Sequence, residues 1–334
     1  MSEEYTAKLP TSWVDVVKSL SEGGLPQILA GPAGKAISRL VAGATDIPAA
    51  WLDARAQRIK DDTTARSTIM KAVAKASADA AVADPQLLDR ALSRYISDLH
   101  RKQGNREAVA EKALEQLADE PAPSESPGPS DDWMNVFEEY AEKANSEELR
   151  QTWARVLAGE IRKPSSFSLR TLQFLSVLDK PTAEACETVL ARVFDRGYVA
   201  VDEEISGELF EKMKVARLSG LIGQVDADTF CSRTTSETGV AIFSFGDDGI
   251  VARGKPNAVI RVPCVSVTVI GQQLYPIIQP KADEHAVNRL VEILQRCAEV
   301  ESIQRGKVKE ANGTTSAFGL QTIWNRPSAA APAN

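Results

Sequence analysis

Histidine and cysteine are scarce in this chain, which limits the chemistry that its side chains can perform. His100 and His285 are the only two histidines among 334 residues, and the four cysteines are Cys186, Cys231, Cys264 and Cys297. No two cysteines form a CxxC pair, and their spacing fits no zinc pattern. Two histidines leave few possibilities for a Ser-His or Cys-His catalytic site. We therefore expect no bound metal and no cofactor, and we expect buried cysteines in a reducing compartment.

The chain also lacks a long apolar run and the motifs of the common enzyme classes. No run of about 18 apolar residues occurs, so no transmembrane helix is expected. The first ten residues, MSEEYTAKLP, resemble no signal peptide, and we expect a cytoplasmic protein. The patterns H-E-x-x-H, G-x-S-x-G and G-x-G-x-x-G are absent. An enzyme that uses carboxylates alone stays open, but we expect a protein that is not an enzyme.

The balance of charge argues against one class of binding protein. Lysine and arginine total 39 and aspartate and glutamate total 46, so the net charge is −7. A protein that coats nucleic acid along its whole length needs the opposite sign. The hydrophobic content of 43% is ample for a folded core.

Proline content and apolar spacing divide the chain into five parts. A helical N-terminal arm (1–119) precedes a Pro-rich linker, EPAPSESPGPSDD (120–132). A helical core domain (133–219), a small α+β part (220–305) and a flexible tail (306–334) follow. We expect strands at 229–233, 240–245 and 258–270, and a turn at 246–249. The predicted fold class is mainly α, with a winged-helix-like C-terminal part.

The centre of the chain, residues 146–179, predicts two amphipathic helices that meet at a tight joint. Ser146 is a good N-cap for the first helix, whose apolar positions recur at helical spacing. Gly159 lies inside this helix, where it costs about 1 kcal/mol relative to Ala. Close approach of the second helix, which begins near Ser168, is the expected reason. Pro164 ends the first helix, because the residue before a proline disfavours the helical conformation.

This stretch resembles the signature of an uncharacterised bacterial family, the domain of unknown function 2806. The resemblance implies a bacterial, intracellular setting and no known activity. The glycine that usually follows the proline of the signature is replaced here by Ser165. We interpret the matching residues as structural: Trp153, Leu157, Gly159, Glu160, Pro164, Phe167, Ser168, Leu169 and Arg170.

Three functional hypotheses follow from these patterns. The first is a scaffold or regulatory protein that binds another protein or its own copies, through an arm rich in Ala and Gly whose small residues let helices approach closely. The second is a winged-helix DNA-binding regulator, in which a helix at 207–218 enters a groove and a hairpin at 245–252 forms the wing. Its phosphate contacts would be Lys212, Lys214, Arg217 and Arg253.

The third hypothesis is peripheral membrane contact through residues 24–51. This segment is nearly free of charge, and Lys35 and Arg39 supply its only basic anchors. Membrane-surface helices usually carry a richer basic face. We therefore favour a small-residue helical hairpin packed inside the protein, or against a second copy, over a membrane contact.

Overall fold

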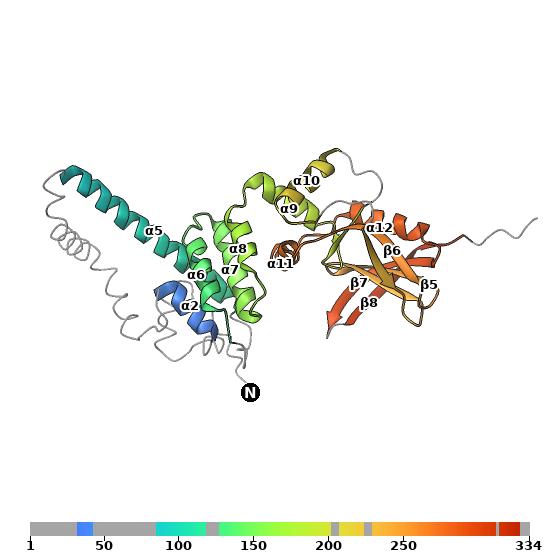
Figure 1. Ribbon diagram of the computed structural model, residues 1–334. Coiled ribbons are helices and arrows are strands. Elements are labelled where there is room, and N and C mark those ends of the chain that lie inside the picture. Colours follow the sequence, from blue (N-terminus) through green and yellow to red (C-terminus); the bar gives the residue numbers. More distant parts are fainter. Residues whose placement is uncertain are drawn as a thin grey trace, which may run out of the picture. The chain divides into compact units, whose positions relative to one another are not determined.

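The structure is a computed structural model, and it describes residues 32–42, 85–117, 127–201, 207–223, 229–311 and 314–327. The chain divides into two compact units, residues 1–172 and 173–334 (Figure 1). Much of the helical arm expected at 1–119 and most of the Pro-rich stretch at 120–132 lie outside the described residues.

The first unit is a helical bundle. Its elements are α2 (Pro32–Ala42), α5 (Pro85–Leu117), α6 (Asp131–Ala141), α7 (Glu147–Arg162) and the beginning of α8 (Leu169–Ser176). Ser130 and Ser146 cap α6 and α7, because their hydroxyl oxygens accept from the amides of Trp133 (3.3 Å) and Leu149 (3.2 Å). The N-cap that the sequence predicts at Ser146 is confirmed.

Helices from both sides of the Pro-rich stretch share one core. The C-terminal half of α5 packs along α7, and the side chains of Val109, Ala113 and Leu117 are fully buried. Asn105 reinforces this packing, since it donates to the Glu142 carbonyl (2.9 Å) and accepts from Arg150 (2.9 Å). The stretch at 120–132 therefore connects helices of a single bundle.

Residues 32–42, the described part of the segment considered for membrane contact, form the docked helix α2. Ile37, Leu40 and Val41 are buried in the first unit. Arg39 donates to Glu138 (2.6 Å) and Asp131 (2.7 Å), and also bonds to Asn135, all on α6. Arg39, one of the two basic residues expected to anchor a membrane contact, therefore binds side chains within the bundle.

The second unit combines helices with two antiparallel sheets. One sheet has the strand order β1-β2-β6-β3, and the other has the order β4-β5-β7-β8. Its helices are α9 (Lys180–Leu190), α10 (Gly207–Leu218), α11 (Val269–Ile278) and α12 (Glu284–Arg296). Its strands are β1 (Val193–Phe194), β2 (Tyr198–Ala200), β3 (Phe230–Thr234), β4 (Val240–Phe245), β5 (Asp248–Gly254), β6 (Val259–Ser266), β7 (Val300–Ala311) and β8 (Thr314–Asn325).

One core lies between α12 and the two sheets. The apolar face of α12, which includes Val287, Leu290 and Leu294, packs with Phe243 of β4 and Val262 of β6. This face follows the helical spacing that the sequence predicts. A bidentate pair between Arg305 of β7 and Glu284 of α12 (2.7 and 2.8 Å) adds a polar contact at the helix N-terminus.

The predicted fold class, mainly α, is wrong. The described residues contain nine helices but also two four-stranded antiparallel sheets, so the fold is α+β. The largest single error is the flexible tail expected from residue 306, because β7 and β8 form a hairpin that extends to Asn325. This segment is rich in Gly, Ser, Thr and Ala, and this composition conceals the alternation of apolar and polar residues that identifies a strand.

The hairpin expected to form the wing is part of the second sheet, in which β5 is an internal strand. The predicted turn is present, with Gly246 at φ 61°, but β5 begins at Asp248 and pairs with β4 on one side and β7 on the other. Strand β3 pairs with β6 in the other sheet. The expected strand at 258–270 ends at Ser266, because Thr268 caps α11.

Candidate functional site

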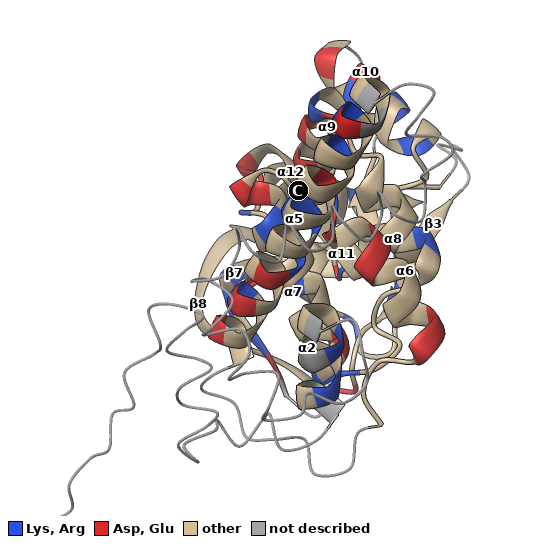
Figure 2. Cartoon of the chain, turned by 90° about the vertical axis from the view of Figure 1, so that its left-hand side faces the viewer, with Lys and Arg blue, Asp and Glu red and all other residues tan. Residues whose placement is uncertain are grey.

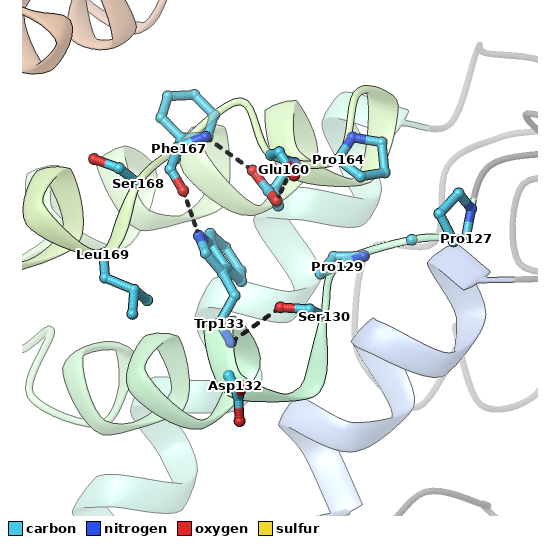
Figure 3. A pocket seen from close by; sticks show the side chains of 12 residues that line it. Pro127, Pro129, Ser130, Asp132, Trp133, Glu160, Pro164, Phe167, Ser168 and Leu169 are labelled. Atoms are coloured by element: carbon cyan, nitrogen blue, oxygen red, sulfur yellow. Dashed lines mark hydrogen bonds between the residues drawn. The ribbon is translucent and has the colours of Figure 1, made fainter.

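The joint between α7 and α8 is built around the carboxylate of Glu160. This side chain lies in the last turns of α7 and is only 2% exposed. One carboxylate oxygen accepts from the Ser165 amide (2.6 Å) and the other from the Phe167 amide (3.0 Å) (Figure 3). Burial raises the pKa of Glu160 above its ordinary value, and the backbone amides of residues 165–167 oppose this rise. Glu160 thus closes the loop that connects the two helices.

Phe167 is held on three sides at this joint. Its amide donates to Glu160, and its carbonyl accepts from the indole Nε1–H of Trp133 (2.8 Å) on α6. Its ring lies against Gly159 of α7. A close approach therefore exists at Gly159, but the contacting ring belongs to the connecting loop and not to the second helix that the sequence predicted.

Ser165 occupies the left-handed region of backbone conformation, with φ 66°. Glycine reaches this region without steric cost, whereas other residues usually avoid it. The position is the one at which the family signature usually has glycine. The Glu160 carboxylate holds the Ser165 amide in place despite this cost.

A pocket of about 550 Å³ lies beside the joint. Figure 3 shows the segment from Pro127 to Trp133 facing Glu160 and the loop from Pro164 to Leu169, which line the pocket. Among the described residues that line it, Glu160 and Asp132 are the only ionisable groups, and Ser130, Ser165 and Ser168 supply hydroxyls. The Glu160 oxygens and the Trp133 N–H are already bonded to backbone groups, and the Ser130 hydroxyl caps α6. These polar atoms of the pocket therefore hold the backbone of the joint.

The other residues of the family signature divide between the core and the surface. Trp153 and Leu157 are buried, and Trp153 stacks on Tyr140 and meets the ring of Phe137 edge-on. The Ser168 hydroxyl accepts from the Thr171 amide at the start of α8 (3.3 Å). Pro164 lines the pocket at half-burial, whereas Leu169 and Arg170 are exposed.

The residues proposed for nucleic-acid contact lie on α10 and β5, and most of them have polar partners. Lys212 pairs with Glu208 (2.7 Å) and Lys214 with Glu211 (3.6 Å), both along α10. Arg253 of β5 donates to Gln304 of β7 (2.8 Å). Figure 2 shows acidic and basic residues mixed along α10. Arg217 lies in the last turn of the same helix.

A further surface, which we call the α5 apolar face, comprises Leu87, Tyr95 and Leu99. Their exposed fractions are 57%, 60% and 49%. In Figure 1 the N-terminal half of α5 extends away from α6 and α7. The sequence indicates this stripe by its helical spacing, but the spacing alone predicts a buried face.

The described residues contain no group of three or more potential metal ligands. Among the helices that the structure describes, none is both long and apolar enough to cross a membrane.

Comparison with known proteins supports the resemblance found in the sequence. Residues 89–200 match the model of a family described as a protein of unknown function, DUF2806. The match covers the whole α7–α8 joint together with most of α5 and the β1–β2 hairpin. Searches of curated proteins and of solved structures found no match. Residues 89–200 of this chain are therefore similar to the DUF2806 family, whose function is unknown.

Proposed function

We propose that this chain is a non-catalytic scaffold or regulatory protein that acts by association with a second copy of itself. The observation that carries the proposal is the contrast between the two halves of α5. The C-terminal half is buried in the bundle, whereas the α5 apolar face exposes Leu87, Tyr95 and Leu99. Large apolar side chains gathered on one exposed helix face are typical of a protein-interaction site.

The charges beside the α5 apolar face favour a second copy as the partner. Asp89 and Asp98 supply negative charge, and Arg90 and Arg94 supply positive charge on the same half of the helix. Two copies of this segment can therefore pair without bringing charges of only one sign together. A strongly acidic or strongly basic partner would meet no surface of the opposite charge here.

The chemistry of the α7–α8 joint supports a non-catalytic role. The polar atoms of Glu160 and Trp133 are engaged with backbone groups, so the joint positions the helices. Catalysis needs polar groups that can reach a substrate.

Size-exclusion chromatography with light scattering on the full chain tests the proposal. We expect an oligomer, and we expect the mass to fall in the double variant Tyr95→Glu/Leu99→Glu, which places four carboxylates in a two-fold interface. The matched control is Val177→Glu/Leu218→Glu, which changes two apolar residues that are 74% and 73% exposed in the second unit. An unchanged mass in the α5 variant, or a monomeric parent, would contradict the proposal.

A cysteine substitution separates contacts between copies from contacts within one chain. We expect Tyr95→Cys to form a disulfide-linked dimer under mild oxidation, whereas Val177→Cys should form no disulfide between copies. The native Cys186, Cys231 and Cys264 are buried and Cys297 is half-buried, so the parent protein without Tyr95→Cys measures the background reaction. Absence of a cross-linked dimer in a folded Tyr95→Cys protein would indicate that the face does not meet its own copy.

A further inference from the structure

The second sheet ends in a long strand whose outer side is open in the part of the chain that the structure describes. The order β4-β5-β7-β8 leaves β8 with β7 as its only described neighbour. Strand β8 has 12 residues, so a row of backbone N–H and C=O groups lies along this edge. Such an edge is a template for another strand.

The composition of β8 lacks the features that usually protect an edge strand. Its sequence, TTSAFGLQTIWN, contains no charged residue and no proline. Lys307 and Lys309 lie one strand further in, on β7. Phe318 and Ile323 are 55% and 46% exposed. A long, uncharged edge with exposed apolar side chains favours pairing with another chain.

The opposite edge of the same sheet is partly covered. Strand β4 has six residues, and the turn after β1 covers part of it. The Asp195 amide donates to the Ser244 carbonyl (2.7 Å), and the Asp195 carboxylate accepts from the Ser244 amide (2.8 Å) and hydroxyl (3.1 Å). Arg233 bonds to the other carboxylate oxygen. Asp195 thus satisfies backbone groups on β4 of the kind that β8 leaves open.

We propose that β8 pairs antiparallel with β8 of a second copy, so that the two four-stranded sheets join into one sheet of eight strands. The neutrality of β8 is the argument for a second copy: in every register of a two-fold pair, no like charges lie opposite each other. The two edges also have equal length, and Phe318 and Ile323 provide cross-strand apolar contacts. This interface lies in the second unit and is separate from the α5 apolar face.

Charge substitution on exposed β8 positions tests this interface. The parent for the experiment is the full chain carrying Tyr95→Glu/Leu99→Glu, so that only the β8 contact remains. We expect this parent to be a dimer by light scattering. We expect Ser316→Lys/Thr322→Lys and Ser316→Glu/Thr322→Glu to be monomers, because each places like charges across the two-fold axis. An equimolar mixture of the two should restore a dimer, which a simple folding defect would not do.

A cysteine scan locates the two-fold axis without depending on charge. Single cysteines at Ser316, Phe318, Gln321 and Thr322 should cross-link with one clear maximum, at the position nearest the axis. Lys309→Cys on β7 is the control and should not cross-link. Circular dichroism confirms the fold of each variant. A monomeric parent, or a β8 scan as unreactive as the β7 control, overturns the proposal and leaves the α5 experiment unaffected.

Discussion

The ring of Phe167 occupies the space that a side chain at position 159 would need. A Cβ atom at Gly159 would lie 2.7 Å from Cε2 and 3.1 Å from Cζ of this ring. The ring cannot retreat easily, because the Phe167 amide and carbonyl are bonded to Glu160 and Trp133. Gly159 is thus required by the loop that follows its own helix.

We expect Gly159→Ala to destabilise the protein. Alanine improves helix propensity by about 1 kcal/mol, but overpacking a buried contact costs about 1–3 kcal/mol, so the free energy of unfolding should fall. Gly104→Ala on α5 is the matched control, because nothing lies within 4 Å of the added Cβ, and it should stabilise. Urea denaturation measures both. If Gly159→Ala gains stability as Gly104→Ala does, the close contact does not constrain the helix.

Ser165→Gly should stabilise the protein by up to about 1 kcal/mol. A left-handed residue that is not glycine costs about 1–2 kcal/mol, and the greater freedom of glycine in the unfolded chain offsets part of the gain. The neighbouring variant Ser166→Gly removes the hydroxyl bond to the Lys163 carbonyl (2.5 Å) and should destabilise. Thermal unfolding should therefore move in opposite directions for the two variants, and a common direction would refute this explanation of the turn.

Glu160→Gln should lower the free energy of unfolding by about 1–3 kcal/mol, the usual cost of leaving a buried donor unsatisfied. Glutamine has one acceptor oxygen, whereas Glu160 serves the amides of both Ser165 and Phe167. The control Glu187→Gln changes an exposed carboxylate on α9 and should have little effect. Equal stabilities for the two variants would show that the joint does not depend on the carboxylate.

The same pair of proteins predicts a pH dependence. Burial raises the pKa of Glu160 above 4.5 in the folded state, so between 4.5 and the raised pKa the folded state binds the proton more tightly. The contribution of Glu160 to stability is therefore fully present below 4.5 and is lost as pH rises through this window. The stability of the parent minus that of Glu160→Gln should fall with rising pH. A rising difference would contradict the direction of the pKa shift.

The nucleic-acid hypothesis makes a separate prediction. Lys212 and Lys214 are paired with acids on their own helix, so we expect no salt-dependent retardation of duplex DNA in a mobility assay. If the full chain does retard DNA at low salt, the variant Lys212→Ala/Lys214→Ala/Arg217→Ala/Arg253→Ala decides whether these residues are responsible. Loss of binding in that variant would favour the regulator over the scaffold.

The sequence predicts the helical elements better than the strands, for a physical reason visible in β7 and β8. Helices carry local signals in the sequence, such as the N-caps Ser130 and Ser146 and the apolar spacing on α12. Tertiary packing leaves these signals unchanged. In the β7–β8 hairpin, register shifts fall between Ile303 and Gln304 and between Arg305 and Lys307. Each shift interrupts the two-residue alternation that identifies a strand.

The candidate site was predictable in its members but not in its contacts. The signature residues from Trp153 to Arg170 identify the joint, and a glycine inside the helix at position 159 indicates a close approach. The bonds from Glu160 to the loop, and from Trp133 to Phe167, join residues whose partners the sequence does not specify. The left-handed conformation of Ser165 is also hidden, because serine does not mark such turns as glycine does.

The packing of α2 and α5 against α6 and α7 has a consequence for how the first unit can be made. Arg39 joins α2 to α6 through Asp131 and Glu138, and Arg106 of α5 reaches Glu142 just after α6 (2.5 Å). These contacts and the shared core hold the helices before residue 118 to the helices after residue 126 by non-covalent interactions. Two fragments produced separately, 1–119 and 127–334, should therefore reassemble by complementation into the same bundle.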